Sequence, residues 1–597
     1  MSKPHSFHIP VMGTSYSIDT PIRVAHYGID SVISIIDHRL TEKMRMHYSK
    51  KHGKHFELIP DTDVDCRAKR ITAYLDLVHD IVQENFATLK KSAFKPDTEI
   101  TKYFEMLPEG SPLKEQYTHM KTAQGEKEHL ELDLKSNMSV GSIDVNIMTK
   151  IDGKTQNKSR EDLPVEFNEA HAALRGFINS KINSSLVLSA GLNPRLFGYM
   201  STFKAFLPHS NGSFSKRIIL KVSDYRSALV QGKMLAKKGL WVSEYRIESG
   251  LNCGGHAFAT EGNLLGPIMQ EFKEKRHDLR TELFELYTKA IQSLHGAHVH
   301  VVPEIDITVQ GGVGNAAEHN LLLSEFGMNS VGWGSPFLLV PEAVNIDKDT
   351  LDLLQNAKEE DYYLSDVSPL GVRFNTVKNT TAEQERDKRV EKGKAGSPCY
   401  KKHLAFNTEF TKEPICTASN KYQKRKIKQL EESISDSTKL TEAVKKVTEK
   451  LCLCVGLANG SLINDGLKMY KGMPGVAVCP GPNMAYFSNV VSLKEMVDHI
   501  YGRTNIIKVS DRPNMFLKEL NMYLNYFQEK LDEQKMEITE KQVKYLESFR
   551  ANLNMGIDYY RSLLDDLAVK ISKTETNILE DLNLLQKRLN SASVSMG

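Results

Sequence analysis

Residues 306–327, DITVQGGVGNAAEHNLLLSEFG, decide the fold class. An apolar strand runs into a cluster of glycines, and a segment with helical spacing follows at once. A second stretch, NSVGWGSPFLLV at 329–340, repeats the order of strand and glycine turn one unit later. Strands that alternate with helices and carry glycines at their C-terminal ends are typical of a TIM (β/α)₈ barrel, and they argue against an antiparallel fold.

The same rhythm appears earlier in the chain. Residues 7–11 form an apolar strand, Thr20-Pro21 opens a helix, and the β-branched run at 31–36 is a strand buried on both faces. The pattern resumes near Ser184 and continues through RIILKV and LWVSEYRI. We therefore predict an α/β fold in which residues 1–40 and 169–345 form the barrel.

Three further segments depart from this rhythm. Residues 41–168 contain long charged helical stretches and are interpreted as a mostly helical insertion. Residues 346–505 are a cysteine-containing extension. Residues 506–597 carry apolar side chains at helical spacing and predict a helical tail, which would pack on the barrel, on itself or on another subunit.

Composition limits the range of functions. The 597 residues include 78 Lys and Arg against 75 Asp and Glu, so no overall charge points to nucleic acid or to a membrane surface. No apolar run reaches the roughly 18 residues of a membrane span. The start, MSKPHSFHIP, lacks the apolar core of a secretion signal, so we expect a cytoplasmic protein. The expected partner is a small-molecule substrate, and the helical additions leave a homo-oligomer open.

Two glycine loops predict a phosphate site. Gly311, Gly312 and Gly314 stand between a strand and a helix, where backbone N–H groups approach an anion closely and the helix dipole favours negative charge. Gly334 and Ser335 lie in the next loop. Tight turns use the same residues, but two such loops in succession build the phosphate site of many barrels.

Two other loops would face the same mouth. His256 follows Gly254 and Gly255 after a predicted strand, where an imidazole could transfer protons near neutral pH. An isolated histidine is more often structural, but the loop position favours the catalytic interpretation. Met12-Gly13-Thr14 ends the first strand, and its small residue would let a flat ring lie against the backbone.

These motifs resemble those of the nitronate monooxygenase family, formerly called 2-nitropropane dioxygenases, and of the related FMN-dependent enoyl-acyl-carrier-protein reductases. The matching elements are Pro10-Val11-Met12-Gly13, Gly254-Gly255-His256, Gly311-Gly312-Val313, and Gly334-Ser335-Pro336-Phe337 followed by Pro341-Glu342-Ala343. They occur in the family order and cover about residues 6–45 and 170–345. The insertion, the long C-terminal region and Cys253 beside the glycines depart from the family pattern.

The resemblance implies FMN at the C-terminal mouth of the barrel, with His256 as acid or base. It assigns the phosphate to the last two glycine loops and the flavin ring to the first loop. The resulting cofactor-binding set is Met12, Gly13, Thr14, Gly254, Gly255, Gly311, Gly312, Gly314, Gly334 and Ser335. Two alternatives stay open: a reductase of activated alkenes that takes electrons from NAD(P)H or another donor, and a barrel without catalysis that serves as a binding or assembly module.

The cysteines are a separate question. Five of the seven lie between 399 and 479, which is not the pattern of a secreted disulfide framework. A cysteine followed by proline, as at Cys479, often completes an iron–sulfur ligand set. The candidate ligands for a cluster or for zinc are Cys399, Cys416, Cys454 and Cys479. Their long spacings lack a compact C-x₂-C signature, so free buried cysteines are the alternative.

Overall fold

A computed structural model describes residues 3–123, 125–157, 159, 161–189, 191–253, 261–507, 512–533, 539–568 and 576–592. At its centre, eight parallel strands form a closed barrel in chain order, which confirms the predicted fold class. Pairing of Phe7 with Val331 joins the first strand to the last and closes the barrel. The strands are β1 (Phe7–Ile9), β2 (Asp30–Ser34), β3 (Ile143–Ile147), β4 (Ser185–Leu188), β5 (Arg217–Val222), β6 (Val242–Glu248), β7 (Asp306–Gln310) and β8 (Ser330–Gly332).

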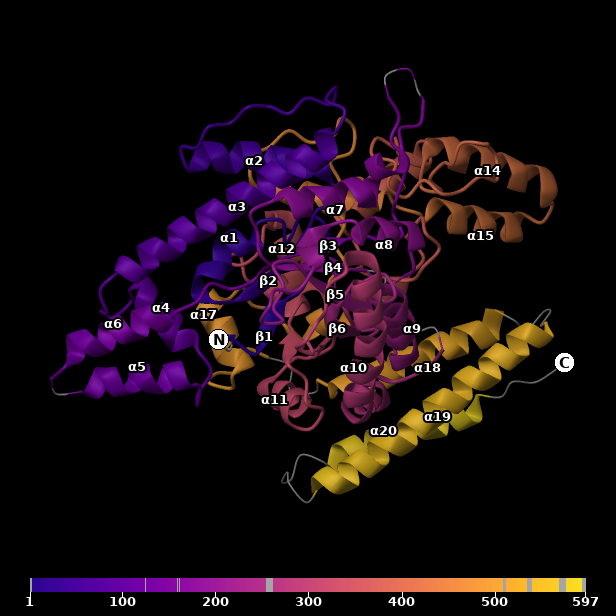
Figure 1. Cartoon of the computed structure of the whole chain (residues 1–597). Coiled ribbons are helices and arrows are strands. Elements are labelled where there is room, and N and C mark those ends of the chain that lie inside the picture. Colours follow the sequence, from indigo (N-terminus) through magenta and orange to yellow (C-terminus); the bar gives the residue numbers. More distant parts are fainter. Residues whose placement is uncertain are drawn as a thin grey trace.

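Helices between the strands surround the barrel (Figure 1). Local sequence sets their ends: Asn193, Asp224 and Asn315 each accept a hydrogen bond from a backbone N–H of the first helical turn. The helices are α1 (Thr20–Val24), α7 (Glu169–Asn179), α8 (Pro194–Met200), α9 (Tyr225–Ala236), α10 (Leu265–His295) and α11 (Ala316–Ser324).

The third strand lies inside the segment 41–168 that we expected to be an insertion. The helical part ends at Asn137, and β3 then pairs with both β2 and β4. Asp144 and Asn146 alternate with apolar residues along β3, so the strand lacks the continuous apolar run that marks most parallel strands. The helices that precede it are α2 (His38–Lys51), α3 (Cys66–Lys91), α4 (Glu99–Met106), α5 (Pro112–Thr122) and α6 (Lys127–Asn137).

The barrel interior contains charged side chains that satisfy one another. The Glu244 carboxylate accepts hydrogen bonds from Arg246 Nε at 2.9 Å and from Thr308 Oγ1 at 2.6 Å. Burial alone would raise the pKa of Glu244, but the Arg246 guanidinium and other cations lower it to about 2. The interior is therefore a packed polar core and not a channel.

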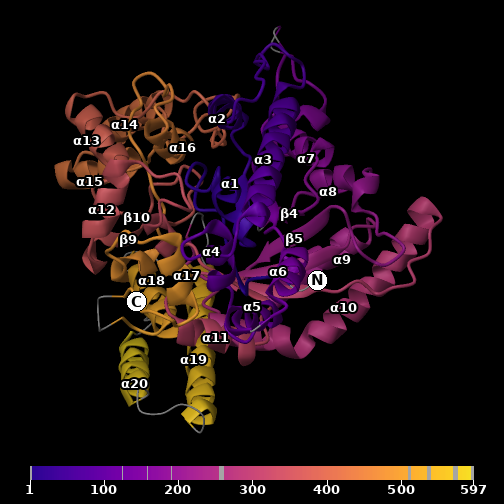
Figure 2. The ribbon, with the colours of Figure 1, turned by 90° about the vertical axis from the view of Figure 1, so that its left-hand side faces the viewer.

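The C-terminal half covers one side of the barrel (Figure 2). It begins with α12 (Lys348–Asn356) and an antiparallel pair, β9 (Tyr362–Ser365) and β10 (Phe374–Val377). Three long helices occupy most of the described part of 506–597, and α19 and α20 lie together as an extended pair (Figure 1). The remaining helices are α13 (Thr381–Glu391), α14 (Asn420–Ser433), α15 (Ser437–Thr448), α16 (Leu453–Asn464), α17 (Leu493–Ile500), α18 (Met515–Glu533), α19 (Glu540–Ala568) and α20 (Thr576–Ser591).

Candidate active site at the barrel mouth

The two predicted phosphate loops follow β7 and β8 at the C-terminal mouth. Gly311 and Gly312 have φ of +107° and +91°, a left-handed backbone that strongly favours glycine. A Cβ on Gly312 would lie 2.7 Å from Leu251 Cδ1, and one on Gly334 would lie 3.1 Å from Cys253 Cβ. The loops after β6, β7 and β8 therefore meet at close quarters.

Free backbone donors remain in both loops. Within the described part of the chain, no hydrogen bond uses the backbone N–H of Gly312 or of Gly334. Backbone N–H groups in such loops are the usual ligands of a phosphate. Gly314 differs, because its N–H donates to the Glu318 carboxylate at 2.8 Å.

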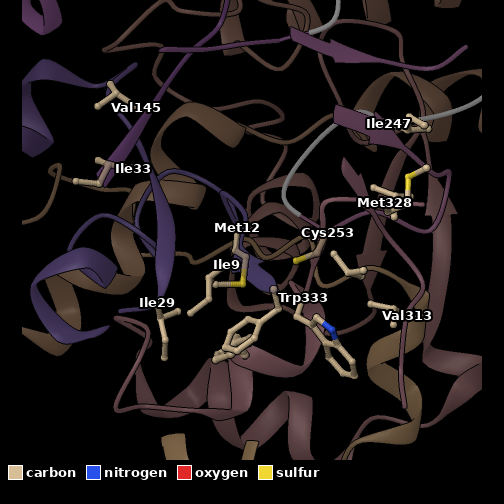
Figure 3. Packing of buried hydrophobic residues seen from close by; sticks show 14 of the residues in the cluster. Ile9, Met12, Ile29, Ile33, Val145, Ile247, Cys253, Val313, Met328 and Trp333 are labelled. Atoms are coloured by element: carbon tan, nitrogen blue, oxygen red, sulfur yellow. The ribbon is translucent and has the colours of Figure 1, made fainter. Parts of the chain in front are cut away.

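Apolar side chains from four loops pack together beside these glycines. Met12, Cys253, Val313 and Trp333 follow β1, β6, β7 and β8, and all four belong to one buried cluster (Figure 3). Burial raises the pKa of the Cys253 thiol, which donates a hydrogen bond to the carbonyl of Cys479 at 3.0 Å. Cys253 is thus held as a protonated, structural thiol.

The extension forms a roof over the mouth. Gly481 has a φ of +70°, and a Cβ there would lie 2.8 Å from Ser335 Oγ. In the loop after β1, the N–H of Ser15 donates to the carbonyl of Leu457 in α16 at 3.0 Å. Asn483 Nδ2 donates to the carbonyl of Val313 at 2.8 Å. The stretch 479–483, CPGPN, therefore contacts the β6, β7 and β8 loops, a role that its motif alone did not reveal.

An ion pair stands at the start of α11. Arg512 donates to both oxygens of Glu318 at 2.8 Å and to the carbonyl of Gly312 at 2.9 Å. Both side chains are buried. Glu318 also accepts a hydrogen bond from the N–H of Gly314. One of the N–H groups predicted to bind a phosphate is therefore already bonded to a carboxylate of the chain itself.

A polar network that the sequence did not single out lies at the ends of β5, β6 and β7. Glu248 Oε1 accepts from Lys221 Nζ at 3.1 Å, from Gln310 Nε2 at 2.8 Å and from Asn252 Nδ2 at 2.8 Å. Because the Gln310 amide nitrogen is committed to Glu248, its oxygen is fixed in orientation, and the Gln310 side chain interacts with the buried imidazole of His8. Asn146 Oδ1, near the end of β3, is buried and has no hydrogen-bond partner in the part of the chain that the structure describes. Only strand order around the barrel brings these residues together.

Several predicted residues lie outside the described part of the chain. Gly254, Gly255 and His256 are among them, because the description of the β6 loop stops at Cys253 and resumes at Glu261. The acid/base role of His256 and the cofactor roles of the two glycines therefore stay predictions. Of the first loop, Met12 is buried and Gly13 has a φ of +78°. Thr14 lies in the same turn, next to Ser15.

The four candidate metal ligands pack into one apolar cluster. Cys399 and Cys416 are hydrogen-bonded to each other, and Cys454 and Cys479 belong to the same cluster. Among the described residues, no three His, Cys, Asp or Glu side chains are arranged to hold a metal ion. The structure gives no support to an iron–sulfur cluster or zinc, although a hydrogen-bonded thiol pair is present.

Comparison with known proteins gives weak likenesses. No family model and no curated protein matches the chain. Among solved structures, the chain is similar to the enoyl reductase domain of MlnA from the macrolactin biosynthesis cluster of Bacillus amyloliquefaciens, at 14% identity and a TM-score of 0.33, over 71% of this chain and 89% of that one. It is also similar to nitroalkane oxidase from Streptomyces ansochromogenes, at 9% identity and a TM-score of 0.32, over 84% and 95%.

The assignment of the barrel rests on the strand pairing. In the part of the chain that the structure describes, no helix is long and apolar enough to cross a membrane.

Proposed function

We propose that the chain is an FMN-dependent oxidoreductase with its cofactor at the C-terminal mouth of the barrel. The observation that carries the proposal is the pair of glycine loops after β7 and β8, whose Gly312 and Gly334 N–H groups have no partner among the described residues. Two consecutive loops at this end of a barrel form a common phosphate site. The motif order that resembles nitronate monooxygenases supports FMN in particular.

The polar residues at the ends of β3, β6 and β7 are suited to contact the ring of a flavin bound at the barrel mouth. The buried Asn146 oxygen lacks a partner among the described residues, and the flavin ring carries an N–H that such an acceptor can bind. Glu248 acts as a positioning residue, since it orients the Gln310 amide. When bound, the flavin would supply the redox chemistry, while the chain orients the substrate and excludes water. His256 is proposed to hold or move the proton.

The glycine loops after β7 and β8 provide only some of the N–H donors that the FMN phosphate would need. Gly312 and Gly334 would donate their N–H groups, whereas the nearby Arg512 charge is already paired with Glu318. Gly314 would not donate, because its N–H is bonded to Glu318. The filled position at Gly314 favours a second candidate, a barrel that has lost catalysis and serves as a binding or assembly module.

Flavin content separates these two candidates. The full chain is purified, its absorption spectrum is recorded, and any released flavin is identified by chromatography. Stripped protein is then titrated with FMN by fluorescence quenching. We expect a yellow protein that rebinds FMN. A folded, colourless protein that does not quench FMN would contradict the proposal and support the non-catalytic module.

A matched glycine pair tests the placement of the phosphate. Gly334 has a φ of −106°, so alanine is compatible with its backbone, but its Cβ would crowd Cys253 and Pro10. We expect Gly334→Ala to weaken FMN binding by about tenfold, which corresponds to about 1.4 kcal/mol. Gly198→Ala is the control, since the nearest atom to its Cβ is Lys238 Nζ at 3.8 Å. Equal FMN affinity in both variants would move the phosphate away from this loop.

A further inference from the structure

A polar cavity, separate from the glycine loops at the barrel mouth, opens beside the C-terminal ends of β2 and β3. Its volume is about 320 Å³. Three distant parts of the sequence build its walls: residues 37–39, residues 153–156 and residues 400–403, together with Arg67 and Glu169. None of the glycine-loop residues lines it. The cavity is therefore a separate site on the same face of the barrel, completed by the C-terminal extension.

The lining has an excess of positive charge. Five cationic side chains face two carboxylates. The cations are Arg39, Arg67, Lys154, Lys401 and Lys402, and the carboxylates are Asp37 and Glu169. Whether this excess is available to a ligand depends on how the carboxylates are paired.

Asp37 is fully engaged within the wall. Its carboxylate forms a buried ion pair with Lys401, and its Oδ1 accepts the N–H of Arg39 and of Leu40, both at 3.1 Å. Burial alone would raise the pKa of Asp37, but the Lys401 ammonium and other nearby cations hold it well below its usual range. This carboxylate therefore does not repel an incoming anion as a free charge would.

Glu169 is engaged in the same way. Its Oε1 accepts a hydrogen bond from His403 Nδ1 at 2.8 Å and from Arg67 Nη2 at 3.2 Å. Lys402 has no carboxylate partner among the described residues. Arg39 and Lys154 pair with Asp61 and Asp162, which lie outside the lining, so Lys402 is the one lining cation left without a carboxylate partner among the described residues.

Two buried nitrogen atoms in the wall have no hydrogen-bond partner among the described residues. His403 is 7% exposed, and its Nε2 makes no hydrogen bond while Nδ1 is held by Glu169. Arg67 Nε is likewise buried and unbonded. A buried polar nitrogen without a partner is destabilising, so such atoms mark a place where a ligand group would be stabilising. The protonated imidazole would donate from Nε2, and the guanidinium donates from Nε at any ordinary pH.

The backbone at the cavity rim is strained. Lys402 has a φ of +60°, a left-handed conformation that is unfavourable for a non-glycine residue. The strained turn leaves the Lys402 side chain exposed between the buried Lys401 and the buried His403. Strain of this kind is concentrated at ligand-binding positions.

We propose that this cavity binds the anionic group of a small-molecule ligand, either a phosphate monoester or a dicarboxylate. Guanidinium and imidazolium N–H groups bind both oxyanions through charge-assisted hydrogen bonds, and Lys402 adds a point charge at the rim. The inference does not depend on bound flavin, since it uses other residues and another cavity.

Titration with two simple anions tests the proposal. The full chain is titrated with inorganic phosphate and, separately, with malonate, by isothermal calorimetry and by thermal melting, at an ionic strength held constant with sodium chloride. We expect saturable binding and a rise in melting temperature. Binding of phosphate alone assigns a phosphate ester, and binding of malonate assigns a dicarboxylate.

Two variants locate the binding. Lys402→Gln removes a rim charge that has no ion-pair partner and should weaken the anion about tenfold. Arg67→Lys keeps the charge but removes the Nε donor, and it should also weaken binding. Lys428→Gln is the matched control, because that lysine is 76% exposed on α14 and should change nothing. Absence of saturable binding, or equal weakening by Lys428→Gln, would overturn the site. Melting curves without anion show that each variant is folded.

Discussion

Arg512 and Glu318 form a buried, two-pronged ion pair, with both N–O distances at 2.8 Å, that ties the extension to the first turn of α11. Removing one partner leaves the other charged and buried, which costs about 3–5 kcal/mol. We predict that Arg512→Met lowers the melting temperature strongly. The N–H groups of Gly314 and Met515 would still hold the Glu318 carboxylate in its buried position, so its charge could not move out to solvent. Thermal unfolding followed by circular dichroism measures the change.

The double variant Arg512→Met with Glu318→Gln is the control for this pair. Because neither buried charge remains, its loss of stability should be smaller than the sum of the two single losses. Additive losses would mean that the two residues act independently, which would contradict the importance of the pair.

Glu519 makes stability depend on pH. It is buried in α18, where it accepts from Ser249 Oγ at 2.9 Å and from the N–H of Leu265 at 2.8 Å. Burial raises its pKa from 4.5 to about 7, despite these hydrogen bonds. Between pH 4.5 and about 7, Glu519 is therefore protonated in the folded protein and ionised in the unfolded chain. Its contribution to the free energy of unfolding falls as pH rises from about 4.5, and it levels off above about 7.

Glu519→Gln mimics the protonated side chain and removes this dependence. We predict that the variant is more stable than the wild type at pH 8, by at most roughly 3 kcal/mol, and that the difference disappears near pH 5. Melting temperatures of both proteins across this range test the sign. A variant that is less stable than the wild type at pH 8 would show that Glu519 is ionised without cost.

The thiol pair predicts selective reactivity. A hydrogen bond from Cys416, with help from the Lys402 backbone N–H and nearby cations, lowers the pKa of Cys399 below that of an ordinary thiol. Burial raises the pKa of Cys66, a thiol of comparable exposure. Since the thiolate is the reactive form, iodoacetamide at pH 7.5 should modify Cys399 at least about tenfold faster than Cys66. Peptide mass spectrometry measures both rates.

The hydrogen bond itself is tested by two changes at Cys416. Cys416→Ser keeps a donor and should preserve the fast reaction, whereas Cys416→Ala should slow it. If Cys399 reacts no faster than Cys66 in the wild type, the thiol pair does not activate it.

The sequence predicted those barrel units whose local pattern, an apolar strand followed by glycines and a helix, matches their place in the fold. The β7 and β8 units carry apolar strands and obligatory glycines, and both are barrel strands in the structure. It did not predict β3, because Asp144 and Asn146 give that strand polar alternation. The contacts at the mouth, such as Cys253 with Cys479, join residues 226 apart and follow from tertiary packing that no local pattern encodes.

The last prediction concerns His256, which lies outside the described residues and is assigned by motif alone. If it transfers a proton at the flavin, His256→Ala should keep FMN, because the proposed phosphate and ring contacts come from other loops. Turnover should then fall by roughly 10²–10⁴-fold, the usual contribution of a positioned acid or base. Oxidation of an alkyl nitronate and NADPH-dependent reduction of an activated alkene are both assayed, with flavin content and melting temperature measured on the same preparation. A histidine that only braces the loop predicts lost flavin or stability with little specific loss of turnover. Near-normal turnover in a flavin-loaded variant would rule out the catalytic role.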